Sequence, residues 1–85
     1  MAGKTRDGIK LSTIVDMVME LGIAVREGTK HPYILQAPGL RPCPVAESTD
    51  ARSMLAPWIG SAVGYRARDV YESLRQGEWY YRAVA

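Results

Sequence analysis

The sequence contains one cysteine, one histidine and no phenylalanine among its 85 residues, and these shortages exclude several classes of protein. Cys43 cannot form an internal disulfide, and it lies between two prolines without the neighbours that a zinc site or a thiol protease needs. We therefore expect no metal ion and no other cofactor. Cys43 is interpreted as a small buried or edge residue.

Long hydrophobic runs are also absent, although 47% of the residues are hydrophobic. No segment reaches the roughly 20 residues of a membrane-spanning helix, and no apolar region follows the polar start to form a secretory signal. The sequence predicts a cytoplasmic protein with no membrane partner, folded as one domain over residues 1–85. Residues 1–10 are expected to form a loose leader and residues 61–85 a C-terminal helical extension.

Neither sign of charge dominates, since eleven Lys and Arg residues stand against nine Asp and Glu residues. The net charge of +2 only weakly favours an anionic partner, because acidic residues are interleaved with the basic ones.

Hydrophobic residues at helical spacing predict a first helix after the leader. Ser12 or Thr13 is a suitable N-cap, and Gly22 is well placed to end the helix at the C′ position. The apolar side is expected to contain Ile14, Val15, Val18 and Leu21.

A hairpin is predicted next, with strands over residues 23–25 and 33–36. Gly28 tolerates the positive φ of a tight turn and Pro32 has no N–H for a central ladder, so the turn is expected between them. A third strand over residues 41–46 should follow a turn, and its two prolines confine it to a sheet edge or a short pairing.

A second helix is predicted after the N-cap candidates at residues 48–50. Pro57 either ends this helix near residue 56 or bends it before it resumes, because an interior proline removes a hydrogen bond. One side of the helix should contain Ala51, Met54, Leu55, Trp58 and Ile59.

The last helix is predicted over residues 66–76, after a connection that Gly60 and Gly64 bracket, with Gly77 as its C-cap signal. The aromatic residues 79–81 either return to the domain or meet a partner. The predicted fold class is therefore α+β, an α-β-β-β-α core with an extra C-terminal helix, in which the two flanking helices cover one face of the antiparallel sheet.

The only histidine, His31, follows Lys30 in the predicted hairpin turn. Histidine is the one side chain that exchanges protons near neutral pH without a perturbed pKa, so this turn is the candidate site for acid–base chemistry. A single histidine in a turn is also commonly an ordinary solvated residue.

The order of elements and residues 28–33, Gly-Thr-Lys-His-Pro-Tyr, resemble the HicA family of small mRNA interferase toxins. Residues 44–45, Pro-Val, followed by Ala51 and Arg52, extend this resemblance over roughly residues 9–60. It implies a double-stranded-RNA-binding-domain-like core and a metal-independent endoribonuclease, with an antitoxin-like protein as a further partner.

On this reading His31 is the catalytic base that takes the proton of an RNA 2′-hydroxyl, while Lys30, Arg26, Arg41 and Tyr33 bind RNA. The sequence departs from the family pattern at two positions. Many members place the hairpin histidine where Lys30 stands, and many carry a second histidine where this chain has Ala46. A divergent toxin and a fold that has lost catalysis are both compatible with these departures.

Two other functions stay open. Residues 69–79 resemble the recognition helix of excisionase-type helix-turn-helix proteins, in which Arg66, Arg68 and Arg75 would face DNA, although the predicted turn before this helix is long and contains two glycines. The third reading is a non-catalytic interaction protein of phage or plasmid type, which would use the C-terminal aromatic residues.

Overall fold

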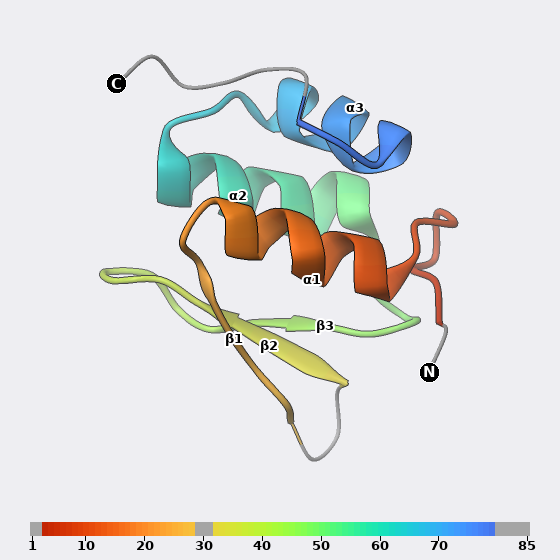
Figure 1. Cartoon of the computed structure of the whole chain (residues 1–85), viewed down its shortest axis with the longest axis horizontal. Coiled ribbons are helices and arrows are strands. Elements are labelled where there is room, and N and C mark those ends of the chain that lie inside the picture. Colours follow the sequence, from red (N-terminus) through yellow and green to blue (C-terminus); the bar gives the residue numbers. More distant parts are fainter. Residues whose placement is uncertain (1–2, 29–31, 80–85) are drawn as a thin grey trace.

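The computed structural model describes residues 3–28 and 32–79. Within them the chain forms an α+β domain whose elements follow the predicted order (Figure 1). These elements are α1 (Leu11–Glu20), β1 (Ala24–Arg26), β2 (Tyr33–Gln36), β3 (Cys43–Val45), the π-helical turn η1 (Ala51–Leu55), α2 (Ala56–Val63) and α3 (Ala67–Gln76).

Helix α1 ends as its sequence predicts, but begins differently. Gly22 has a φ of 81°, its N–H donates to the Met19 carbonyl, and the Ile23 N–H donates to the Val18 carbonyl. This pair of bonds is the Schellman ending that a C′ glycine permits. The prediction of Ser12 or Thr13 as the N-cap is wrong, because the helix starts after Lys10 without a side-chain cap.

The sheet is antiparallel in the order β1-β2-β3, which confirms the predicted meander. Val25 pairs with Leu35, and Leu35 pairs with Cys43, so the hairpin register also agrees with prediction. Strand β3 is shorter than predicted and forms an edge of the sheet. At an edge, the missing N–H of Pro44 removes no hydrogen bond to a further strand.

The second helix continues past Pro57 by changing its geometry. The Ala56 N–H donates to the Ala51 carbonyl, five residues back, and this π-type turn places Pro57 at the start of α2. A proline is tolerated in a first helical turn, where its missing N–H has no required partner. Of the predicted inner face, Ala51, Leu55 and Ile59 are fully buried, but Met54 is 57% exposed.

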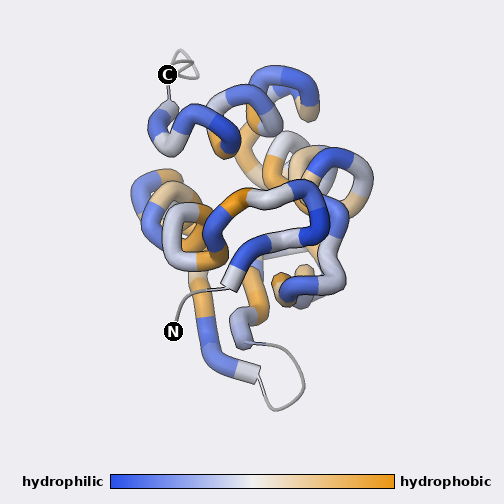
Figure 2. The backbone as a smooth tube through the Cα atoms, turned by 90° about the vertical axis from the view of Figure 1, so that its right-hand side faces the viewer, coloured by the Kyte–Doolittle hydropathy of each residue, from blue (hydrophilic) through white to orange (hydrophobic). Residues whose placement is uncertain are grey.

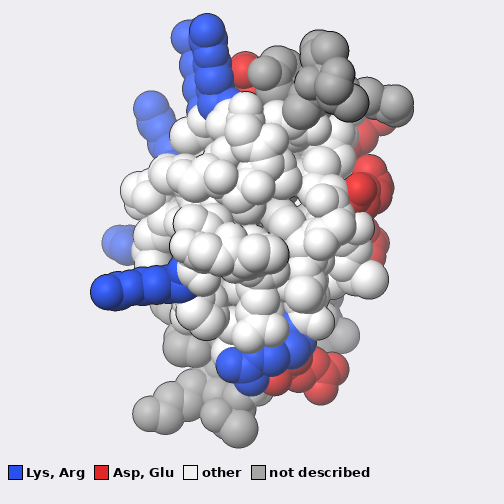
Figure 3. Space-filling view, turned by 90° about the vertical axis from the view of Figure 1, so that its left-hand side faces the viewer, with Lys and Arg blue, Asp and Glu red and all other residues white. Residues whose placement is uncertain are grey.

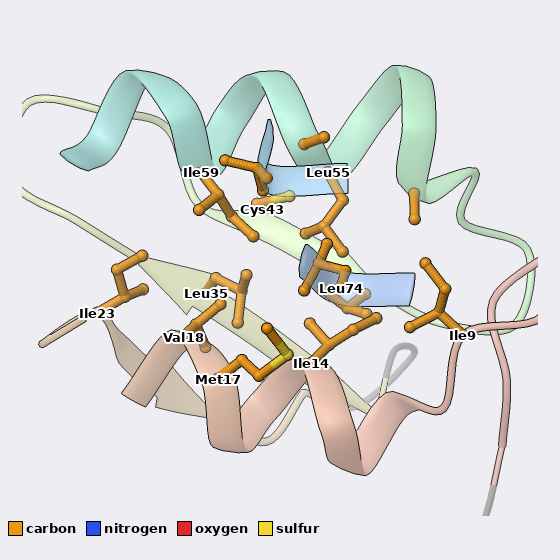
Figure 4. Close-up of a cluster of buried hydrophobic side chains, with 14 of the residues drawn as sticks. Ile9, Ile14, Met17, Val18, Ile23, Leu35, Cys43, Leu55, Ile59 and Leu74 are labelled. Atoms are coloured by element: carbon orange, nitrogen blue, oxygen red, sulfur yellow. The ribbon is translucent and has the colours of Figure 1, made fainter. Parts of the chain in front are cut away.

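Helices α1 and α2 lie on the same face of the sheet, and α3 lies over both of them on the side away from the sheet (Figure 1). The prediction that both flanking helices cover one sheet face is confirmed. The hydrophobic stretches of the chain lie mostly toward the centre of the domain (Figure 2). There, Ile14, Val18, Leu35, Leu55 and Leu74 interdigitate in one buried cluster (Figure 4).

Residues 3–10 do not form the loose leader that we predicted. Lys4 and Lys10 form a β-bridge around a turn, and the buried side chains of Thr5 and Ile9 anchor this turn to the domain. The Arg6 N–H also donates to the Thr49 carbonyl, 2.9 Å away. The misprediction arises because burial here depends on contacts with residues more than 40 positions away.

The connection between α2 and α3 is shorter than predicted. Helix α2 continues to Val63, so only residues 64–66 separate the two helices. Gly60 lies inside α2, and a larger residue would not fit there, because a Cβ at this position would stand 2.6 Å from the Tyr65 carbonyl oxygen. Beyond α3, which Gly77 ends as predicted, Trp79 returns to the domain and donates from Nε1 to the Met17 carbonyl at 2.8 Å.

Candidate nucleic-acid interface

Strands β1 and β2 flank the segment predicted to be catalytic. The paired strands bring Arg26 opposite Ile34, close to the end of the hairpin where Gly28 and Pro32 lie. The predicted catalytic residue His31 and its neighbour Lys30 lie outside the described residues. The structure therefore confirms the antiparallel pairing of the two strands on either side of this candidate site.

The other predicted RNA-binding residues do not gather into one strip. Arg26 is exposed on edge strand β1, near the hairpin turn. Arg41 is exposed beyond the opposite edge, two residues before β3 and at the other end of the sheet, where its carbonyl accepts a 2.7 Å hydrogen bond from Trp58 Nε1. Tyr33 pairs with the buried Val45 and packs against the core, which places it on the helix side of the sheet.

Metal and thiol chemistry have no candidate site among the described residues. Residues 3–28 and 32–79 contain no cluster of three His, Cys, Asp or Glu side chains that could hold a metal ion. Cys43 is buried, and this burial raises the pKa of its thiol to about 11. A thiol with so high a pKa carries almost no thiolate at neutral pH, which agrees with a structural role.

Two neighbouring hollows between residues 4–13, η1 and α3 form a site that the sequence did not reveal. The first has a volume of about 490 Å³ and lies between the 4–10 turn and the end of α3. The second, of about 580 Å³, lies between Arg52 of η1 and the outer side of α3. Arg75 lines both hollows, so they adjoin at this side chain.

Exposed cations surround these two hollows. They are Lys4, Lys10, Arg52, Arg68 and Arg75, which we call the basic strip. Arg75 lies over the ring of Tyr71, with its Cζ 5.9 Å from the ring centroid, a geometry that favours attraction between cation and ring. No sequence spacing could have joined these residues, because they come from three separate segments.

Asp7 lines the first hollow, and hydrogen bonds occupy its carboxylate. Its Oδ1 accepts from the Thr5 hydroxyl at 2.8 Å and the Ala51 N–H at 3.1 Å, and its Oδ2 accepts from the Arg52 N–H at 3.2 Å. Burial acts to raise the pKa of Asp7, but these hydrogen bonds together hold it below its ordinary value of 3.8. Asp7 thus acts as a cap for the helix that starts at residue 51, supplied from 44 residues away.

The pKa of Tyr71 is raised by desolvation and by the Asp7 carboxylate, to which its hydroxyl donates a hydrogen bond, while Arg75 and Arg52 act in the opposite direction. Tyr71 therefore lies close enough to both arginines for their charges to act on its hydroxyl.

Charge is also segregated elsewhere on the surface. On the face seen in Figure 3, Lys and Arg stand mainly along one side and Asp and Glu along the other.

The chain matches no protein-family model, no curated protein sequence and no solved structure. In the part of the chain that the structure describes, every helix is too short or too polar to cross a membrane.

Proposed function

We propose that this protein is a HicA-like RNA-binding protein with a double-stranded-RNA-binding-domain-like core, and that it cleaves mRNA through the hairpin. The observation that carries this proposal is the layered order α1-β1-β2-β3-α2, with both flanking helices on one face of an antiparallel sheet. Domains of this kind bind RNA largely by shape and by contacts to phosphates and 2′-hydroxyls. Such contacts require exposed cations more than base-specific pockets.

The proposed chemistry needs no metal ion. His31 takes the proton of the 2′-hydroxyl, whose oxygen then attacks the adjacent phosphorus and displaces the 5′-oxygen of the next nucleotide. No side chain is assigned as the general acid, so the leaving 5′-oxygen takes its proton from water, and the products are a 2′,3′-cyclic phosphate and a 5′-hydroxyl. Lys30 stabilises the negative charge that develops on the phosphate. Arg26, exposed close to the hairpin turn, binds a neighbouring phosphate. Arg41 lies beyond the opposite edge of the sheet and toward its other end, so we assign it a separate, peripheral contact.

Bacterial growth tests this function in the cell. Induced expression of the wild type should arrest growth and shorten the half-life of bulk mRNA, whereas His31→Ala should do neither at equal protein level. Growth arrest that persists with His31→Ala would exclude the hairpin mechanism. An antitoxin-like partner is part of the same proposal, and its co-expression should restore growth. We place this activity in the cytoplasm, where mRNA is available.

One observation favours DNA binding as the second candidate. The connection between α2 and α3 comprises only residues 64–66, and three residues are a usual length for the turn of a helix-turn-helix motif. The long predicted connection was the main reason against this reading. Arg66, Arg68 and Arg75 are exposed at the start and along the outer side of α3, as contacts to DNA would need. Preference for duplex DNA over RNA of the same sequence would favour this function over the first.

A further inference from the structure

We infer that the basic strip is a second nucleic-acid-binding surface, separate from the hairpin, which holds the phosphodiester backbone of a strand across its two hollows. The strip consists of Lys4, Lys10, Arg52, Arg68 and Arg75. In Figure 1, α3 lies at the top of the domain, whereas the end of β1 and the start of β2 lie at the bottom, so the two surfaces face different directions.

Charge gives the first reason. The two hollows are lined by five cations and by two carboxylates, those of Asp7 and Glu72, which gives a local net charge of +3. The whole chain carries only +2, so the strip contains more than the entire excess of positive charge. A concave surface with one sign of charge concentrates counter-ions of the opposite sign, here an anionic ligand.

The state of these charges gives the second reason. Within residues 3–28 and 32–79, none of the five cations forms an ion pair with a carboxylate, so their donors are available. The negative charge of Asp7 is already counted in the net +3, and its oxygens accept hydrogen bonds from Thr5 and from the backbone of the first turn of η1. Arginine guanidinium groups left free in this way are well suited to phosphate oxygens, which they bind in a bidentate manner.

The shape of the site gives the third reason and indicates a chain of phosphates. One phosphate group would occupy a single pocket, but here two hollows of about 490 and 580 Å³ meet at Arg75. Lys4 and Lys10 stand on one side of Arg75, and Arg52 and Arg68 on the other. Cations spread along two adjoining hollows match the regularly spaced charges of a nucleic-acid backbone.

The full-length protein and the double variant Arg52→Ala/Arg75→Ala test this inference in fluorescence anisotropy titrations with a labelled RNA hairpin and with DNA of the same sequence. Each lost phosphate contact lowers the slope of log K against log salt by about 0.9 for duplex DNA and about 0.7 for a single strand. The double variant should therefore lose about 1.4 to 1.8 of this slope. Arg6→Ala removes an exposed cation that lines neither hollow and has no role in the hairpin or in α3, so it is the matched control and should keep the affinity of the wild type.

Arg52→Lys/Arg75→Lys retains both charges and should keep most of the slope, and circular dichroism confirms that each variant is folded. The RNA and DNA arms identify which nucleic acid occupies the strip. An unchanged slope in the double alanine variant would overturn the inference, as would a wild type that binds neither probe. Loss of RNA binding in Arg26→Ala with normal behaviour of Arg52→Ala/Arg75→Ala would support the hairpin function and reject the strip. The reverse result would support the strip alone.

Discussion

Replacement of Asp7 by alanine should destabilise the domain far more than an exposed surface residue normally does. Its carboxylate caps the helix starting at Ala51 through bonds of 3.1 and 3.2 Å, and also accepts from Thr5. Loss of an N-cap costs about 0.5–2 kcal/mol, and each further hydrogen bond contributes roughly 0.5–1.5 kcal/mol. Asp50 still accepts from the Arg52 N–H at 3.1 Å in the variant, so part of the cap survives.

We expect the free energy of unfolding to fall by about 2 kcal/mol in total. For a domain of this size, that corresponds to a decrease in Tm of roughly 8–16 °C. Thermal and urea denaturation followed by far-UV circular dichroism measure both quantities. Asp16→Ala is the matched control, because Asp16 is exposed on α1 and should change stability by less than about 0.5 kcal/mol. A cost for Asp7→Ala no larger than that of the control would refute the capping role.

The variant Asp7→Asn separates the charge of Asp7 from its shape. The pKa of Asp7 is lower in the folded protein than its ordinary value of 3.8, so the carboxylate contributes stability that is present above this value. That contribution is lost as the pH falls through the lowered, folded-state pKa. The stability of the wild type should therefore fall toward that of Asp7→Asn under acid conditions, whereas a constant difference would contradict the linkage.

Two further predictions concern the packing of the domain. Gly60→Ala should destabilise it by roughly 1–3 kcal/mol in urea denaturation, because the added Cβ would stand 2.6 Å from the Tyr65 carbonyl oxygen. The control Ser61→Ala changes an exposed neighbouring residue and should have little effect. Equal stabilities of the two variants would show that α2 and α3 approach each other less closely than the structure indicates. Cys43 should react with a thiol reagent slowly at neutral pH in the native protein and rapidly in urea, because burial raises its pKa to about 11, and rapid native labelling would mean that β3 opens readily.

Local signals allowed much of the fold to be predicted from the sequence. Gly22 and Gly77 ended their helices because each adopts the positive φ that a C′ or C-cap position needs. The prolines beside Cys43 placed β3 at an edge, since a proline has no N–H for a further strand. Such signals act between residues close in sequence, and they are strong enough to fix the order α-β-β-β-α.

Features that depend on distant contacts could not be predicted. The 4–10 turn is anchored by bonds to residues 49–52, and no local pattern marks Asp7 as the cap of a helix 44 residues away. The same limit applies to the basic strip, whose cations are separated in sequence by up to 71 positions, from Lys4 to Arg75. Met54 was misplaced because the π-type turn at η1 shifts the helical phase that its spacing assumed.

RNA cleavage in EDTA is the measurement that tests the proposed function most directly. Purified wild type should bind and cleave a labelled mRNA fragment without metal, and His31→Ala should bind with nearly the same affinity but not cleave, because a general base acts mainly on the transition state. Lys30→Ala should weaken binding in a salt-dependent manner. A wild type that does not bind RNA, or cleavage that survives His31→Ala, would contradict the proposal.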